Sequence, residues 1–420
     1  MGTVIGSGVF LVPGSVARQI PTIELTLGLW LLGGLLTLFG ALSVAELGSA
    51  YPKAGGLYVY LKAAYGRPLA FLYGWGLLTL IHSGCLATLA VAFALYLDQL
   101  IPLSAAQQKL VACAAIAFVT VVNCVGLRAG KGVQNLVTAC KVGGIAALVI
   151  ALFAAGRLSR ITSAVPAEGS ITPLSIGAGL VAILWAYEGW HVVSFTAGEF
   201  RDPQRDLPRS LAWGVSLVVA IYLLANLAYF AVLSPAQVQA TDRAAATAMS
   251  SAYGVSAAGL VTLLIVVSIF GSMNGTALTG PRVYFAMAKD GLFFPAFARL
   301  NLKTGAPALA IVVQGIWSCV LTLAGNFQEL FTYVIFTSWM FYGATVLGVL
   351  VLRSRRPELP RPFRVPGYPW IPILFVLSSA FITVTTIVNH PRNAFYGIGL
   401  ILLGLPFYWF LFRRSTADHE

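Results

Sequence analysis

Long apolar runs dominate this sequence and restrict the structures that it can form. We count twelve, and several exceed the length of about 20 residues that an α-helix needs to cross a bilayer. Charged residues make up only 10% of the 420 residues, against about 25% in soluble globular proteins. The runs are too long for the alternating segments of about ten residues that build a membrane β-barrel. The pattern predicts an all-α integral membrane protein with spans at 2–20, 24–50, 68–101, 110–126, 133–155, 174–198, 209–233, 254–288, 307–324, 328–352, 370–388 and 394–412.

Basic residues are distributed unevenly between the loops. If the loop after the second span is cytoplasmic, 19 of the 26 lysines and arginines lie on the cytoplasmic side and six on the other, with Lys141 inside a span. By the positive-inside rule, the sequence predicts a multi-pass protein of the plasma (inner) membrane with both termini in the cytoplasm. This asymmetry accounts for the net charge of +12, so no nucleic-acid partner is needed to explain it.

Glycine and serine interrupt the first apolar run at residues 5–10, which read Ile-Gly-Ser-Gly-Val-Phe. Glycine weakens a helix because it loses the most conformational freedom there. One interpretation is a face of small residues for close helix packing. The other is an unwound segment, which survives in a bilayer only against protein or around a polar cavity. Because only five residues precede Gly6, we expect either residues upstream of Met1 or a naturally truncated first helix.

A glycine also lies inside the sixth run, where residues 183–191 read Ile-Leu-Trp-Ala-Tyr-Glu-Gly-Trp-His. The first and sixth runs open two successive groups of five, and interruptions at corresponding positions of two repeats indicate the midplane site of a transporter. The predicted fold is a five-plus-five inverted repeat with discontinuous helices 1 and 6. Its units are a first repeat at 1–155, a second at 174–352, two peripheral helices at 370–412 and a cytoplasmic tail at 413–420.

Among the ionisable residues inside the predicted spans, we consider four. Lys141 lies roughly 12 Å into the fifth span, so it either snorkels to the surface or faces the bundle with a functional role. Glu188 has two interpretations. It is either hydrogen-bonded to a neighbouring helix, or it has a functional role as a proton acceptor or as the negative group that binds a cationic substrate. We expect Glu46 to pair with a loop lysine and His82 to be a hydrogen-bonded core residue.

These motifs resemble the amino acid-polyamine-organocation (APC) transporter superfamily, and most closely its L-type amino acid transporter branch. The resemblance runs from residue 4 to about 375 and includes segments 198–209, 271–282 and 352–362 besides the two interrupted stretches. Each motif is weak alone, but their order and spacing on twelve predicted helices are specific. The resemblance implies a LeuT-like fold. It also implies a sodium-independent amino acid transporter, an exchanger or proton-linked symporter, that works by alternating access and is not an enzyme.

The resemblance further implies how a substrate is held. The N–H groups of Ser7 and Gly8 would bind the carboxylate of the amino acid, as helix N-termini bind anions. The carbonyl groups of Val4, Trp185 and Glu188 would bind its ammonium group. Trp185 would be an aromatic gate, while Ser338 and Trp339 would border the side-chain pocket. The implied substrate-binding set is Val4, Gly6, Ser7, Gly8, Trp185, Tyr187, Glu188, Gly189, Ser338 and Trp339.

Lys141 matches a lysine that, in this branch, occupies the place of a sodium ion in relatives. Its ammonium group would contact the carbonyl of Gly6 and the hydroxyl of Thr276. A proton could leave this lysine during transport, or the lysine could stay charged throughout and have a structural role only. The implied set for cation-site mimicry or proton coupling is Lys141, Gly6, Thr276 and Glu188.

The sequence departs from the family pattern at three places. The first helix is short. Glu188 and His191 stand where animal L-type members commonly have small or amide residues, so we expect a more polar pocket. The loop 101–110 lacks the cysteine that binds a glycoprotein heavy chain in animal members, so we expect no disulfide-linked heavy chain and a stand-alone prokaryotic protein. An amino acid and the lipid bilayer are the expected partners, with no cofactor or metal. A transport-inactive amino acid sensor or truncated paralogue is the alternative function.

Overall fold

The computed structural model describes residues 2–157 and 171–412, without the side chains of residues 127–131, 133, 411 and 412. Every regular element within these ranges is a helix. A helix satisfies its backbone N–H and C=O groups internally, which is why long apolar runs adopt it in a bilayer. The predicted tail at 413–420 lies outside the described residues, and so does Met1.

Ten helical segments in the described part of the chain are long and apolar enough to cross a membrane. The coarse prediction of an all-helical membrane protein is therefore confirmed, while the count of twelve crossings and the two inverted repeats stay predictions. A seventeen-residue apolar helix, α14 (Ala308–Ala324), and a twelve-residue helix, α1 (Gly8–Gln19), are shorter. The ten are α2 (Ile23–Ala50), Arg67–Leu97, α6 (Ala105–Val125), α7 (Leu127–Ala155), Pro173–Glu199, α10 (Pro203–Val232), α13 (Val255–Lys289), α15 (Phe327–Arg355), α16 (Trp370–Asn389) and Pro391–Phe410.

Several segments are subdivided in ways that the apolar pattern does not show. The segment Arg67–Leu97 consists of α4 (Arg67–Gly76), a π-helical turn η1 (Leu77–Ile81) and α5 (His82–Leu97). Short helices form where the sequence suggested loops, among them α3 (Leu57–Tyr65), α11 (Pro235–Gln239), α12 (Ala244–Tyr253) and η3 (Pro295–Ala298). The last part of the chain contains α17 (Pro391–Leu402), α18 (Gly404–Phe407) and η4 (Tyr408–Phe412). Capping explains some of these ends, since Ser234 and Gln237 form a capping box at α11.

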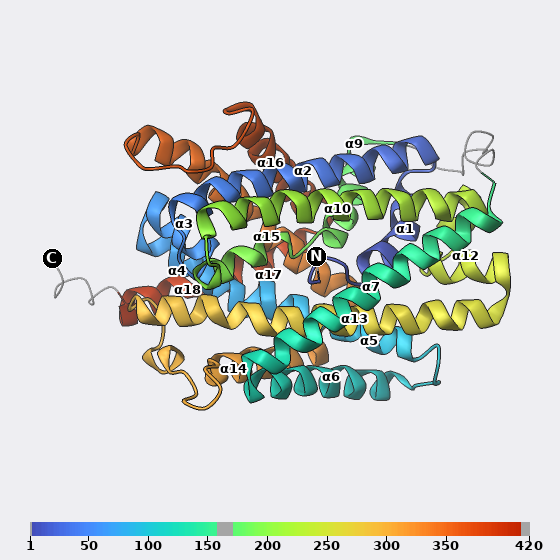
Figure 1. Ribbon diagram of the computed structural model, residues 1–420, viewed down its shortest axis with the longest axis horizontal. Helices are drawn as coiled ribbons and strands as arrows, with labels where there is room; N and C mark the ends of the chain where they lie inside the picture. Colours follow the sequence, from blue (N-terminus) through green and yellow to red (C-terminus); the bar gives the residue numbers. More distant parts are fainter. Residues whose placement is uncertain (1, 158–170, 413–420) are drawn as a thin grey trace.

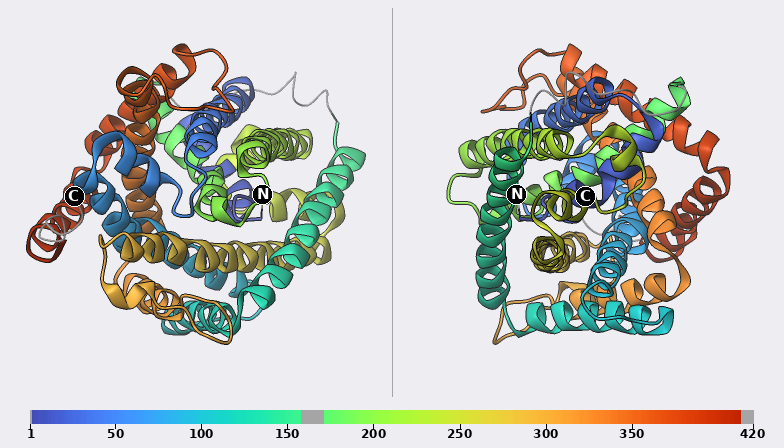
Figure 2. Two further views of the ribbon diagram at one scale, coloured as in Figure 1. Left: turned by 60° about the vertical axis from the view of Figure 1, so that its left-hand side comes forward. Right: turned by 90° about the vertical axis from the view of Figure 1, so that its right-hand side faces the viewer.

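The helices pack so that the beginning of the chain lies inside the bundle. Helix α1 packs on α9 (Pro173–Ala186), and α2 runs along α10. On the other side α13 packs against α5 and α7, while α14 pairs with α6. Figures 1 and 2 place the N-terminal stretch among these helices, near the middle of the molecule. Residues 2–8 are therefore surrounded by protein.

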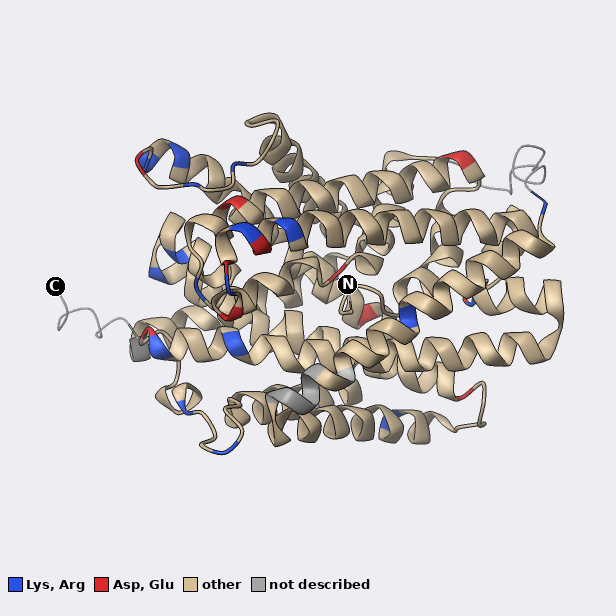
Figure 3. Cartoon of the chain, in the orientation of Figure 1, with Lys and Arg blue, Asp and Glu red and all other residues tan. Residues whose placement is uncertain are grey.

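Charged residues gather at one end of the bundle, on the left in Figure 3. Ion pairs there connect segments that are distant in the sequence. Lys62 Nζ lies 2.7 Å from Asp290 Oδ2, and Arg282 Nε lies 2.7 Å from Glu199 Oε1. The Tyr58 hydroxyl donates a hydrogen bond of 2.9 Å to Asp290 Oδ2, and burial together with this carboxylate raises the pKa of Tyr58, so the hydroxyl stays a donor. The assignment of this end to the cytoplasm stays a prediction from the charge pattern.

Glu46 pairs with arginines and not with the loop lysine that the sequence suggested. Arg353 donates two hydrogen bonds to its carboxylate, at 2.8 and 2.7 Å, and Arg361 Nε lies 3.5 Å away. The backbone N–H of Val365 donates a further bond of 2.7 Å. The planar guanidinium group matches both carboxylate oxygens at once, which a lysine cannot do, and Lys62 is already held by Asp290.

Candidate functional site

The two interrupted stretches of the sequence meet in the core. Residues 2–7 form turns and bends, and α1 begins at Gly8. A Cβ atom on Gly8 would overlap the Cα atom of Ala186, the last residue of α9. Only a residue without a side chain permits this approach, which explains the glycine at position 8. The start of one helix is thus fixed against the end of the other.

The α-helical geometry of α9 ends at Ala186, and residues 187–189 form a turn. Gly189 has a φ of 98°, a left-handed conformation that glycine adopts without strain. The 3-10 helix η2 (Trp190–Glu199) follows in a new direction. The end of a helix leaves its last carbonyl groups without the usual intrahelical partners. Here the N–H of Glu188 donates to the carbonyl of Trp185 at 3.1 Å, and the carbonyl of Ala186 accepts from a side chain.

Two side chains connect residues 3–4 to the end of α9. The Tyr222 hydroxyl, from α10, lies 3.0 Å from the carbonyl oxygens of both Val4 and Ala186, and it can donate to either. The Thr3 hydroxyl lies 3.3 Å from the carbonyl oxygen of Gly189. This role of Tyr222 was not predicted, because nothing in the sequence distinguishes it from the other 15 tyrosines.

The N-terminus of α1 offers a polar surface that suits an anion. The first N–H groups of any helix have no intrahelical partner, and the helix dipole adds partial positive charge there. Ser7, which precedes α1, is 1% exposed, and its hydroxyl oxygen has no hydrogen-bond partner among the described residues. A buried polar atom without a partner is uncommon in folded proteins and indicates a place for a bound polar group. The assignment of Ser7 and Gly8 to the substrate carboxylate stays a prediction.

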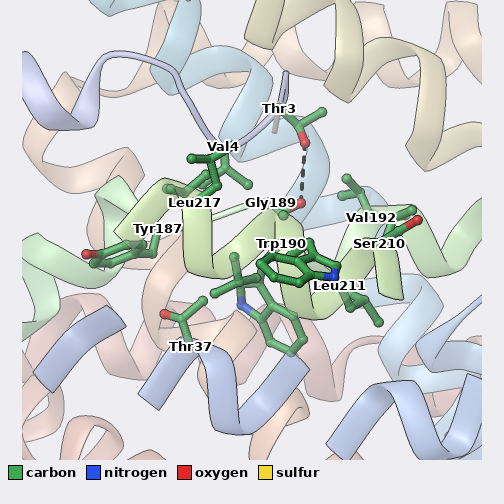
Figure 4. A pocket seen from close by; sticks show the side chains of 15 residues that line it. Thr3, Val4, Thr37, Tyr187, Gly189, Trp190, Val192, Ser210, Leu211 and Leu217 are labelled. Carbon is green, nitrogen blue, oxygen red and sulfur yellow. Dashed lines mark hydrogen bonds between the residues drawn. The ribbon is translucent and has the colours of Figure 1, made fainter. Parts of the chain in front are cut away.

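A pocket of about 360 Å³ lies beside this junction. Val4, Tyr187 and Gly189 are the predicted site residues that line it, and Figure 4 shows Thr3 reaching across to Gly189. The wall opposite is formed by α10, from Ser210 to Val218, and by Thr37 of α2. The Tyr187 hydroxyl donates to the carbonyl of Trp30 at 3.2 Å, which holds its ring at the edge of the pocket.

Lys141 of α7 is fully buried and reaches the interrupted start of the chain. Its Nζ donates hydrogen bonds to the carbonyl oxygens of Gly2 (2.9 Å) and Ile5 (2.6 Å) and to the hydroxyl of Ser272 on α13 (2.8 Å). The ammonium group therefore faces the bundle, and snorkelling to the surface is wrong. The implied contacts to Gly6 and Thr276 are also corrected.

These corrected contacts have a simple geometric cause. The carbonyl that meets the ammonium group belongs to Ile5, one residue before Gly6, and the hydroxyl belongs to Ser272, one helical turn before Thr276. The Thr276 hydroxyl is already committed, because it donates to the carbonyl of Ser272 at 3.0 Å. The Ser268 hydroxyl contacts the carbonyls of Ile5 and Gly6 at 3.3 and 3.4 Å. The rotation of α13, which sequence spacing does not specify, selects Ser272.

Glu188 lies in the turn between α9 and η2 and belongs to a buried cluster with Tyr342 and His191, which we call the Glu188 triad. The Tyr342 hydroxyl donates to Glu188 Oε1 at 2.5 Å, and His191 Nδ1 lies 2.9 Å from the same hydroxyl. The side chains of Glu188 and His191 are 7% and 1% exposed. Both interpretations of Glu188 therefore stay open, since it is hydrogen-bonded to a neighbouring helix and is also close to the candidate site.

The remaining predicted residues lie around this junction. Trp185 is 5% exposed and its ring contacts Phe331 and Phe327 at the start of α15, with centroid distances of 6.0 and 6.4 Å. Trp339 stacks on Phe375 of α16 at 5.1 Å. Its neighbour Ser338 is fully buried. Trp339 thus packs between α15 and α16. Trp185 lies near the end of α9, directly before the turn that carries Glu188.

His82 fits its predicted role in the core. Its ring is hydrogen-bonded to the backbone of Thr276 and lies edge-on to His191, with a centroid distance of 6.2 Å. Its Nδ1 atom has no partner among the described residues, so one of its two ring nitrogens is satisfied and the other is not.

Comparisons with known proteins agree with this architecture. The family model of the amino acid permeases matches residues 1–412. The chain is 34% identical to the serine/threonine exchanger SteT of Bacillus subtilis, over 99% of this chain and 95% of that protein. It is 34% identical to the mouse b(0,+)-type amino acid transporter 1, over 98% and 85%. It is 31% identical to the mouse large neutral amino acids transporter small subunit 2, over 97% and 78%. The chain therefore belongs to the amino acid permeases of the APC superfamily, on their L-type branch.

Proposed function

We propose that this protein carries amino acids across a membrane without sodium, as an exchanger or a proton-linked symporter that works by alternating access. Membership of the amino acid permeases supports amino acid transport. The name of one relative, a serine/threonine exchanger, supports exchange, and the name of another, a large neutral amino acids transporter, supports neutral substrates.

The junction of α1 with α9 is the proposed substrate site. The amino acid carboxylate binds the N–H groups of Ser7 and Gly8, where a helix N-terminus favours an anion. The substrate ammonium group binds backbone carbonyl groups at the ends of the two interruptions, those of Val4, Trp185 and Glu188. The Tyr222 hydroxyl supports this arrangement because it contacts the carbonyls of both Val4 and Ala186 and so keeps the two interruptions side by side.

Lys141 carries the argument for sodium independence. Two carbonyl oxygens and one hydroxyl oxygen converge on its ammonium group at 2.6 to 2.9 Å. Oxygen atoms of this kind are the ligands that hard cations use in proteins. Because a covalently attached cation already occupies the cage, a free sodium ion would meet electrostatic repulsion there and would have no ligands left to bind. Gly6, whose carbonyl contacts Ser268, lies at the rim of the same cage.

Counterflow measurements test the proposal. The purified protein is reconstituted into proteoliposomes that contain one unlabelled amino acid, and uptake of radiolabelled amino acids is measured in sodium chloride and in choline chloride. We expect uptake of at least one neutral amino acid that requires an amino acid inside and proceeds equally in both salts. Uptake that occurs only with sodium would refute sodium independence.

A second measurement separates transport from binding alone. Ligand-induced thermal stabilisation of the purified protein reports binding without any movement across the membrane. Stabilisation by an amino acid without counterflow in sealed vesicles would indicate the transport-inactive sensor. Counterflow that depends on an imposed proton gradient and needs no internal amino acid would indicate symport and not exchange.

A further inference from the structure

The Glu188 triad combines a carboxylate, a phenol and an imidazole in a place that excludes water. Glu188 is 8% exposed, and Tyr342 and His191 are 1% exposed each. The three groups are contributed by two separate parts of the chain, the turn and first residues of η2 on one side and the middle of α15 on the other. The Tyr342 hydroxyl lies between the other two groups and contacts both.

Glu188 differs from Glu46, the other buried acidic residue in the described part of the chain, in its lack of an arginine or lysine partner. Glu46 is neutralised by Arg353 and Arg361. Among the described residues, the basic group within 4 Å of the Glu188 carboxylate is His191, whose Nδ1 lies 3.8 Å from Glu188 Oε1. A buried carboxylate without a cation is unfavourable by several kcal/mol. It is neutralised either by a proton or by a cation that arrives from outside.

The neighbouring groups do not supply a permanent positive charge. Tyr73 of α4 and Cys85 of α5 are close enough to interact electrostatically with Glu188. The His82 ring is 6.2 Å from that of His191, edge-on. Lys141 donates its hydrogen bonds to oxygen atoms of residues 2, 5 and 272, so its charge is engaged elsewhere. The surroundings of the triad thus consist of neutral groups and of imidazoles that can take up a proton.

The hydrogen bonds allow the triad to hold one additional proton. With Glu188 ionised, the Tyr342 hydroxyl donates to the carboxylate and accepts from the protonated Nδ1 of a neutral His191, and the triad carries one negative charge. An added proton resides either on the Glu188 carboxyl or on the imidazole as an imidazolium. In the first case the carboxyl donates to Tyr342 and Tyr342 donates to Nδ1 of a neutral His191 whose own proton is then on Nε2. In both arrangements all three hydrogen-bonded groups keep their partners and the net charge is zero.

The triad lies next to the proposed substrate position. Gly8, whose N–H group is assigned to the substrate carboxylate, packs against Ala186, and Glu188 is two residues further along the same turn. A substrate held at the start of α1 would therefore lie beside the segment that carries the carboxylate. A cationic side chain of the substrate and a proton can each neutralise this one carboxylate, so they compete for it.

We propose that the Glu188 triad binds either one proton or the cationic side chain of a substrate. This proposal rests on the amino acid site proposed above. The deprotonated triad accepts amino acids with a cationic side chain. The protonated triad accepts amino acids with a neutral side chain. One proton with a neutral amino acid then carries the same charge through the protein as one cationic amino acid.

Competition between a cationic and a neutral substrate tests this proposal. Proteoliposome counterflow of radiolabelled arginine and threonine is measured from about pH 5 to about pH 8, the range in which histidine titrates. The ratio of arginine to threonine uptake is expected to rise with pH. Glu188→Gln is expected to lower this ratio at least about tenfold at high pH and to remove its pH dependence, because a buried charge pair loses one partner. Tyr342→Phe and His191→Asn are expected to move the pH at which the ratio changes.

Matched controls lie outside the triad. Glu24→Gln removes a carboxylate from the first turn of α2, and Tyr284→Phe removes a buried hydroxyl that has no hydrogen-bond partner in the described structure. Both are expected to keep the wild-type ratio and profile. If Glu188→Gln cannot be purified as a folded protein, the pH profile of His191→Asn tests the proposal instead. An asparagine can hydrogen-bond to Tyr342 but cannot take up a proton.

The two proposals fail in different ways. A wild-type ratio that does not change with pH, or an unchanged profile in both Glu188→Gln and His191→Asn, overturns the role of the triad while amino acid transport persists. Absence of counterflow for every amino acid in the wild-type protein overturns the proposed function itself.

Discussion

Gly8 and Ala186 are packed so closely that a Cβ atom on residue 8 would overlap the backbone of residue 186. The contact joins the first residue of α1 to the last residue of α9, so each helix end limits where the other can lie. Two apolar runs that are 178 residues apart in the sequence thereby form one polar junction, with the N–H groups of a helix start on one side and the carbonyl groups of a helix end on the other.

Substitution of Gly8 is expected to abolish transport. Gly8→Leu places a side chain against Ala186 and over the N–H groups of α1, so counterflow of every amino acid should fall to background. The measurement is counterflow at equal amounts of protein, judged by the folded fraction on size-exclusion chromatography. Gly28→Leu is the control, because a Cβ atom at Gly28 of α2 meets no atom within 4 Å. Transport retained in folded Gly8→Leu would contradict the assignment of this junction as the substrate site.

Loss of the Tyr222 hydroxyl is expected to weaken the junction without changing its shape. Tyr222→Phe leaves the carbonyls of Val4 and Ala186 without this donor, which should lower the free energy of unfolding by about 1 to 2 kcal/mol and raise the KM for the amino acid. Thermal unfolding in detergent and counterflow kinetics measure the two effects. Tyr96→Phe is the control, since that hydroxyl is also buried and has no hydrogen-bond partner in the described residues. Equal behaviour of the two variants would show that Tyr222 does not connect the interruptions.

Removal of the Lys141 charge is expected to disrupt the oxygen cage at the start of the chain. Lys141→Met removes the donor to the Gly2 carbonyl, the donor to the Ser272 hydroxyl and the nearest of three donors to the Ile5 carbonyl, at a cost of about 3 kcal/mol. Lys141→Arg should not restore function, because the planar guanidinium group does not fit a compact cage. Counterflow and thermal unfolding report the loss. Lys109→Met on α6 is the control, because Lys109 is at the surface and donates one hydrogen bond, to the carbonyl of Leu323. Normal transport by Lys141→Met would exclude a role for the ammonium group.

The sequence predicts the parts of this site that depend on backbone composition. Glycines at positions 6, 8 and 189 indicate where the helical geometry is absent, because no other residue is as compatible with a close backbone approach or a positive φ. The burial of Lys141 follows from its depth in an apolar run, since an intramembrane cation has to face protein or water. For these features the physical reason is local and can be found within a short window of residues.

Features that depend on helix rotation could not be predicted from the sequence. Tyr222 and Tyr342 lie in apolar helices where several tyrosines occur, and only the packing of α10 and α15 directs these two toward the interruptions. The same reason accounts for one wrong partner of Lys141, because the rotation of α13 directs Ser272 and not Thr276 toward the ammonium group. The π-helical turn at Leu77–Ile81 has no composition signal either. Tilt and rotation of membrane helices are set by their neighbours.

Loss of the Glu46 carboxylate is expected to lower the stability of the protein and to change substrate selection less. Its carboxylate holds Arg353, Arg361 and the backbone N–H of Val365, and so connects the end of α2 to the segment after α15. Glu46→Gln leaves two guanidinium groups without a counter-charge. Since the Arg353 side chain is 21% exposed and partly solvated, we expect a loss of about 2 kcal/mol, below the 3 to 5 kcal/mol typical of a fully buried pair.

Thermal unfolding of the purified Glu46→Gln protein measures this loss, and counterflow with the amino acid panel measures selectivity. Glu358→Gln is the control, because Glu358 is an exposed acid in the same loop. A second variant, Arg353→Met with Glu46→Gln, removes both members of the closest pair and should be more stable than Glu46→Gln alone if an uncompensated charge is the cause. Two results would mean that the Glu46 ion pair does not hold this segment. One is an equal loss in Glu358→Gln, and the other is a double variant whose loss relative to the wild type equals the sum of the losses in Glu46→Gln and in Arg353→Met.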